Sequence, residues 1–245
     1  TFETPNTVPT FQNTWGGGYD GNFDTWNKVT VGGQNYIQHP GWMFDNWGGK
    51  MDGQLINFET LPDVGLVPLK GQPENNIQKF YRTGQTFTNT LSLSSVTDKI
   101  NFRASLSNLS NQGIIPNNSF NKQSIDMIVA AHITDRLTME VKANYIRQNT
   151  NNRPYLGQNR RNIATALNWT SRDVSLDWLR NYKNADGSMR GFTAYGYPLN
   201  PYWILNEYLN DDRRDRLIGF VSLNYKFTNW LSLNLRTGTD SYTDL

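Results

Sequence analysis

Hydrophobic and polar residues alternate along several stretches of the chain, most clearly in residues 220–236. Thr228 and Asn229 interrupt the alternation, which then resumes on the far side. A period of two predicts strands with one apolar face and one wet face, here a hairpin with a very short turn. The apolar positions of this hairpin are Leu217, Val221, Leu223, Tyr225, Phe227, Leu231, Leu233 and Leu235.

The same alternation begins at Gln85 and predicts four more strands in residues 85–146. Thr97 with Asp98 and Thr134 with Asp135 form the short turns of two further hairpins. Residues 216–242 supply the last two of the six predicted strands. Each strand has roughly the ten residues that a tilted strand needs to cross a bilayer.

The connections between these strands alternate in length. Short turns at 97–98, 134–135 and 228–229 alternate with longer connections at 110–120 and 147–215, while residues 1–84 show little periodicity. Outer-membrane barrels have short turns on the periplasmic side and long loops outside. The pattern therefore predicts an all-β fold, a segment of a large antiparallel transmembrane β-barrel, with residues 1–84 and 147–215 as extracellular loop regions.

The predicted wet faces are too polar for the core of a soluble β-sandwich and suit a lumen. They carry Arg103, Asp126, Glu140, Lys142, Asn144, Lys226 and Arg236. At the last short turn, Tyr225, Phe227 and Trp230 gather as a predicted aromatic girdle at a membrane interface. That girdle would indicate which end of every strand faces the periplasm.

Composition narrows the class of protein. Only 37% of the residues are hydrophobic, and no apolar run approaches the roughly 18–20 residues of a spanning helix, which excludes a helical membrane protein. The formal net charge of +2 has no basic run behind it and gives no reason to expect nucleic acid. The absence of cysteine excludes disulfides and thiol catalysis.

Signals for an enzyme are weak. His39 precedes a proline in a loop and His132 lies on a polar strand face, and neither has a partner at catalytic spacing. We therefore predict no catalytic residues, no enzyme activity and no cofactor. Asp20, Asn22 and Asp24 resemble the start of a calcium loop, but Thr25 and Val31 replace the Gly and Glu that such a loop needs. Calcium is only a weak alternative.

Aromatic residues in the first loop region are the candidate ligand-binding residues. They lie among Gly, Asn and Asp, and flat rings beside planar amides suit stacking on sugars. The alternative is that they pack the loops together or against a partner protein. The candidates are Trp15, Tyr19, Trp26, Trp42 and Trp47.

The second loop region has three predicted local elements. A short helix is expected to start near Ser171, Asp186 and Gly187 form the tip of a turn, and the sequence NPYWIL predicts a helical turn that begins at a proline.

A set of segments, taken in order, resembles the barrel of SusC/RagA-type TonB-dependent outer-membrane transporters. The segments are VPTFQNTWGGGYDG, DNWGGKMDGQ, NNIQKFYRTGQTFTNTLSLS, NFRASLSNLSNQGIIPNNSF, ITDRLTMEVKANYIRQNTNNRP, NPYWIL and RRDRLIGFVSLNYKFTNWLSLNLRTGTD. The resemblance implies a barrel of about 22 strands with a plugged lumen in the bacterial outer membrane. No signal peptide, TonB box or plug is seen, so we expect an internal piece of the barrel.

The resemblance also implies partners and cargo. A SusD-like surface lipoprotein would form a lid, TonB would act through the region not seen here, and oligosaccharides or peptides would be imported. Outer-membrane lipid would surround the barrel, and a homodimer of transporter–lid pairs would fit the family. Two alternatives stay open: a soluble carbohydrate-binding β-sandwich, and a barrel receptor or adhesin without transport.

Overall fold

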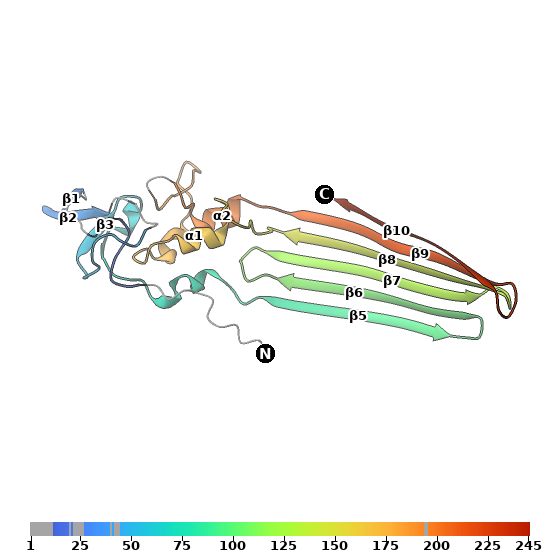
Figure 1. The fold of residues 1–245 in the computed structure, drawn as a ribbon. Helices are drawn as coiled ribbons and strands as arrows, with labels where there is room; N and C mark the ends of the chain where they lie inside the picture. The colour runs from blue at the N-terminus through green and yellow to red at the C-terminus, as the bar shows by residue number, and fades with distance from the viewer. Residues whose placement is uncertain (1–11, 20, 22–26, 40, 42–44, 194–195) are drawn as a thin grey trace. The chain divides into compact units, whose positions relative to one another are not determined.

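The computed structural model describes residues 12–19, 21, 27–39, 41, 45–193 and 196–245 and divides the chain into two compact units (Figure 1). The sheet unit comprises residues 83–153 and 210–245. The loop unit comprises residues 1–82 and 154–209. The chain passes between the units next to the start of β5, the end of β8 and the start of β9. All three strand ends lie away from the short turns.

The sheet unit is one antiparallel sheet of six strands in the order β10-β9-β8-β7-β6-β5. This confirms the predicted all-β class and the six strands, which run further from the short turns than the sequence predicted. β5 and β10 are the two edges, so the described sheet is open. The strands are β5 (Gln85–Val96), β6 (Ile100–Gln112), β7 (Ser119–His132), β8 (Leu137–Asn151), β9 (Asp212–Lys226) and β10 (Ser232–Asp244).

Strand register places the alternating residues on two distinct faces. Directly paired residues share a face, and Val141 of β8 is paired with Val129 of β7 and Val221 of β9. The apolar face therefore carries the odd-numbered residues of every strand except β6, where it carries the even-numbered ones. The opposite, polar face carries Glu140 and its partners Ala130 and Ser222.

The short turns of the three hairpins are displaced from one another in one direction. The last β5–β6 pair, Val96 with Asn101, is level with Glu140 through Ala130. The last β7–β8 pair contains Thr138, two residues nearer the turn than Glu140. Thr138 is level with Asn224, and the last β9–β10 pair contains Lys226, again two residues further on. Each hairpin thus advances by two residues, or one residue per strand.

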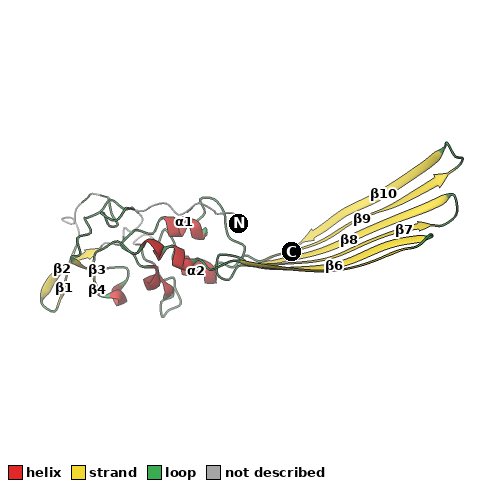
Figure 2. Ribbon diagram, turned by 90° about the horizontal axis from the view of Figure 1, so that it is seen from below, coloured by secondary structure: helices red, strands yellow, loops and turns green. Residues whose placement is uncertain are grey.

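The loop unit contains more regular structure than predicted. Its four-stranded sheet has the order β1 (Lys28–Val31), β2 (Gln34–His39), β3 (Leu55–Phe58) and β4 (Leu66–Pro68), with β2 and β3 parallel. The described helices all lie in this unit (Figure 2). None of the described helices is long and apolar enough to cross a membrane. The helices are η1 (Pro62–Val64), η2 (Glu74–Asn76), η3 (Gln78–Phe80), α1 (Ile163–Asn168), η4 (Leu176–Arg180) and α2 (Pro201–Glu207).

The core of the loop unit draws residues from both loop regions. Residues from 56–80 and from 163–205 are buried together in this one unit, which explains why neither region is an independent loop. The predicted loop region 1–84 contains short strands and 3₁₀ helices within residues 28–80, and this distant packing stabilises them. The largest buried apolar side chains are Ile56, Phe58, Leu61, Leu69, Leu167, Val174, Leu176, Leu179 and Phe192.

Local capping sets the helices of the second loop region. Asn200 accepts a hydrogen bond from the backbone of Tyr202 at 2.9 Å, and Pro201 opens α2, which confirms the helical turn in NPYWIL. The helix expected near Ser171 instead begins at Leu176 and is a 3₁₀ helix, because Ser175 is its cap. The predicted turn tip is confirmed, since Gly187 has a φ of 83° and donates to the carbonyl of Asn184.

Candidate functional site: an apolar sheet face and paired glycine segments

The apolar face of the sheet unit is exposed. Leu91 is 72% exposed and Leu235 is 58% exposed, whereas apolar residues in the middle of the sheet, such as Val129 and Val141, are half-buried. An apolar surface that spans six strands marks an interaction site rather than an ordinary solvated surface. The exposed members are Leu91, Leu93, Leu106, Ile125, Met127, Leu217, Val221, Leu223, Leu233 and Leu235.

The apolar residues form a band across the strands, and its edge near the short turns is staggered. On β10 the band lies next to the short turn, at Leu233 and Leu235. On β8 it extends from Leu137 to Tyr145, which is eight residues or about 26 Å along the strand. On β5 it lies far from that level, because Leu91 is level with Tyr145 and, on β10, with Ser241. The edge of the band near the short turns therefore follows the hairpin turns, whereas its far edge lies at one register level from β5 to β9.

A polar row bounds the band on the same face. The last apolar row of the band consists of Leu91, Leu106, Ile125, Tyr145 and Leu217. Two residues further along each strand, on the same face, the aligned residues are Asn89, Asn108, Gln123, Arg147 and Asp215. The four strands β6 to β9 thus change from apolar to polar at one level, whereas on β5 the exposed Phe87 lies beyond Asn89 on the same face.

At the charged end of this row, the carboxylate of Asp215 accepts hydrogen bonds from three side chains. Arg147 donates to Asp215 from Nε at 2.7 Å, and the hydroxyl of Tyr145 donates to it at 2.7 Å. Arg213 also donates to Asp215, at 2.9 Å. A tyrosine with its ring on the apolar side and its hydroxyl on the polar side suits a boundary between lipid and water.

The predicted girdle residues lie at the opposite end of the sheet. β9 ends at Lys226, and Phe227 and Trp230 belong to the short turn. The rings of Tyr225 and Phe227 contact each other edge-on, with centroids 4.8 Å apart, and Trp230 is 83% exposed. The turn thus brings the three aromatic residues to one end of the hairpin, while their role at a membrane stays a prediction.

The polar face carries paired charges and amides. Arg214 with Asp244 and Arg216 with Asp240 each form two hydrogen bonds between β9 and β10. Asn144 donates to Asp126 at 2.8 Å between β7 and β8. Such cross-strand pairs hold polar side chains on a face that the sequence predicted to be wet.

Two glycine-rich segments of the loop unit pair with each other. The backbones of Gly16 and Gly48 exchange hydrogen bonds with the facing segment at 3.0 Å, and Trp47 donates to Gly18 at 2.9 Å. A Cβ on Gly48 would lie 2.1 Å from the carbonyl oxygen of Gly17, so only glycine permits this approach. The pairing is why WGGG and DNWGG occur in one chain.

This pairing brings two of the candidate ligand-binding residues together. Gly18 and Gly21 hydrogen-bond to the backbone of Trp47, so Tyr19 and Trp47 come from neighbouring backbone segments. Their side chains are 56% and 64% exposed, and Trp15 is half-buried. The candidates Trp26 and Trp42 lie outside the described residues, as do the calcium candidates Asp20, Asn22 and Asp24. No group of three or more metal-binding side chains occurs in the described part of the chain.

A buried polar cluster that the sequence did not reveal lies beneath the paired segments. The carboxylate of Asp173 accepts from the hydroxyl of Ser171 at 2.5 Å and from the amide of Gly17 at 3.0 Å, and it lies 3.3 Å from Nε2 of His39. Nδ1 of His39 accepts from the amide of Gly41, so the ring proton faces the carboxylate. His39 and Asp173 are buried, and they join parts of the chain more than 130 residues apart.

Burial alone would raise the pKa of Asp173, but its partners outweigh it. His39 has the largest opposing effect, followed by the Ser171 hydroxyl and the Gly17 amide, and together they hold the pKa of this carboxyl below its ordinary value. The order of the groups does not suit nucleophilic catalysis, because the serine hydroxyl is bonded to the carboxylate and not to the imidazole. The cluster therefore holds the loop unit together, and its only sequence signal was a histidine without a local partner.

Comparison with known proteins adds no relative to this description. No family model matches the chain, and no curated protein matches it.

Proposed function

We propose that this chain forms part of the wall and outer loops of a SusC/RagA-type, TonB-dependent outer-membrane importer that takes up oligosaccharides or peptides. The apolar face contacts lipid, and the polar face lines the lumen. The loop unit carries the contacts to cargo and to a SusD-like lid, with Tyr19 and Trp47 as cargo-contacting candidates.

The stagger of the three hairpin turns is the observation that supports this proposal most strongly. A shift of one residue, about 3.3 Å, for each strand spacing of about 4.8 Å corresponds to a tilt of about 35° if the turns lie in the membrane plane. Strands of outer-membrane barrels tilt by about 35–45°. With this tilt, the apolar stretch of β8 covers about 22 Å of membrane thickness, close to the apolar band of such barrels.

The main rival from another class is a soluble carbohydrate-binding β-sandwich. A sandwich would bury Leu223, Leu231 and Leu233 beneath a second sheet, but these residues are 38%, 46% and 45% exposed. A barrel receptor or adhesin without transport shares the wall and differs only in whether cargo crosses it.

Cysteine labelling in intact cells tests the membrane orientation, because this chain has no cysteine of its own. In the intact protein, Ser188→Cys marks the exposed turn of the loop unit and Asn229→Cys marks a short turn of the sheet unit. A maleimide that cannot cross membranes should label Cys at 188 on intact cells and Cys at 229 only after the outer membrane is opened. Equal labelling of both positions on intact cells would contradict a membrane-spanning sheet.

Import is tested separately with the correctly oriented protein. Uptake of radiolabelled oligosaccharide and peptide mixtures should require the intact protein and an energised TonB system. Normal orientation with no uptake of either class would favour the receptor or adhesin instead.

A further inference from the structure

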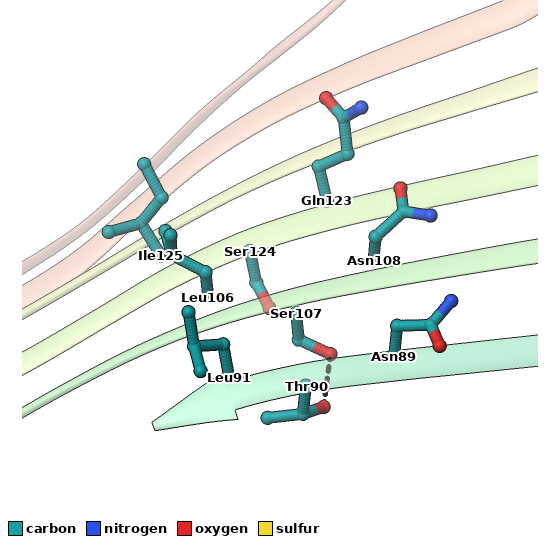
Figure 3. A pocket seen from close by; sticks show the side chains of 9 residues that line it. All are labelled: Asn89, Thr90, Leu91, Leu106, Ser107, Asn108, Gln123, Ser124 and Ile125. Carbon is teal, nitrogen blue, oxygen red and sulfur yellow. Dashed lines mark hydrogen bonds between the residues drawn. The ribbon is translucent and has the colours of Figure 1, made fainter. Parts of the chain in front are cut away.

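A groove on the apolar face crosses β5, β6 and β7 at the boundary of the band (Figure 3). Its volume is about 420 Å³. Leu91, Leu106 and Ile125 form one directly aligned row, and the next row on this face consists of Asn89, Asn108 and Gln123. The groove therefore has an apolar wall and an amide rim, with Thr90, Ser107 and Ser124 between the two rows.

The three amide groups of the rim are available to an outside partner. No described residue forms a hydrogen bond with the side-chain amide of Asn89, Asn108 or Gln123, and Figure 3 shows them as a row from adjacent strands. On the next two strands the same row is occupied by Arg147 and Asp215, which bond to each other. The unpaired part of the boundary is thus confined to the groove.

We propose that this groove binds the head group of a membrane amphiphile whose head carries hydroxyls and no charge, as in a glycosyl diacylglycerol, with its acyl chains against the apolar wall and the band beyond it. An amide both donates and accepts hydrogen bonds without charge, which matches sugar hydroxyls. A phosphate would need cationic donors, and the nearest guanidinium in the rim row, that of Arg147, is engaged by Asp215. The inference rests on the proposed membrane location of the sheet.

Native mass spectrometry of the intact protein tests this site with two probes that share the same acyl chains, glucosyl diacylglycerol and phosphatidylglycerol. The site variant is Asn89→Ala/Asn108→Ala/Gln123→Ala. The matched control is Ser92→Ala/Ser105→Ala, because these two residues are directly paired on the opposite face of β5 and β6 and do not line the groove. Orientation of each variant is checked by labelling Cys at position 229.

The parent and the control should retain glucosyl diacylglycerol over phosphatidylglycerol, and the site variant should retain at least about fivefold less of the glycolipid, since it loses several hydrogen bonds of about 1 kcal/mol each. Equal retention by the site variant and the parent would overturn the proposed site, as would a preference for phosphatidylglycerol, while correct labelling would leave the membrane location standing. Failure of the parent itself to insert would overturn both proposals.

Discussion

Two side chains on the apolar face, Val141 and Leu233, lie at different distances from the short turns. Val141 lies in the middle of the apolar stretch of β8, whereas Leu233 is one residue from the last β9–β10 pair. Both residues are on the apolar face, but the register places Leu233 near the short turn. In a barrel wall, an arginine should therefore be far more costly at Val141 than at Leu233.

We expect Val141→Arg to destabilise the folded protein by roughly 2–4 kcal/mol and Leu233→Arg by about 1 kcal/mol or less, because the cost of a lipid-facing charge falls from midplane to interface. Urea unfolding in lipid vesicles measures both. Glu140→Arg, on the polar face beside Val141, is the matched control and should change little. A similar cost at all three positions would argue against a lipid-facing band.

In the loop unit, the buried carboxylate of Asp173 should contribute strongly to the free energy of unfolding. Asp173→Asn should lower the free energy of unfolding at neutral pH by about 3 kcal/mol, because a buried carboxylate with several donors is replaced. Asp177→Asn is the control, since that carboxylate is half exposed and pairs with Lys79 and Arg180. Its loss should cost about 1 kcal/mol or less.

The contribution of Asp173 to stability should also depend on pH. The pKa of Asp173 is lower in the folded state, so its stabilisation is present above the ordinary aspartate pKa of about 3.9 and is lost as pH falls below that value. Urea midpoints of the parent should drop more steeply than those of Asp173→Asn between pH 5 and pH 3. Parallel curves for the two proteins would contradict the assigned role.

At the scale of elements, the paired glycine segments are the most sensitive contact of the loop unit. Gly48→Ala should cost about 3 kcal/mol, the upper end of the cost of overpacking, because its Cβ would meet backbone rather than a flexible side chain. Gly191→Ala is the matched control, since its nearest neighbouring atom would be 3.6 Å away. It should change stability by less than about 1 kcal/mol. Thermal unfolding followed by tryptophan fluorescence compares them, and equal shifts would contradict the close approach.

The sequence predicted the long strands of the sheet unit but not the short strands of the loop unit. The long strands were predictable because each carries its own alternation, as in Leu137 to Tyr145, and register followed from short turns. The sheet of the loop unit was not, because β1 to β4 have three to six residues each and are stabilised by residues such as Leu176 and Phe192 from far along the chain. The partner of His39 was hidden for the same reason.

For the whole molecule, the stagger of the sheet makes a prediction about orientation. Polarised infrared spectroscopy on aligned membranes containing the intact protein should report a mean strand tilt near 35°, as one residue of shift per strand requires. Strands parallel to the membrane normal, or lying in its plane, would contradict the wall geometry. Gly219→Val is an internal comparison, because its side chain would meet the carbonyl oxygen of Lys142 and disturb β8 and β9.

In the proposed barrel, the same stagger would sort the residues of the polar face into layers. Because neighbouring strands are offset by one residue and side chains alternate, every second strand points inward at a given depth. Along this wall, layers from β5, β7 and β9 such as Ser94, Ala130 and Asn224, then Ser92, Ile128 and Ser222, carry no charge. Between and beyond them, β6, β8 and β10 supply Arg103, Glu140 and Asn234, then Ser105, Lys142 and Arg236. In the proposed lumen, a solute moving past these four layers would meet neutral and charged rows in turn, and beyond them Asp126 brings a charge to a layer from β5, β7 and β9.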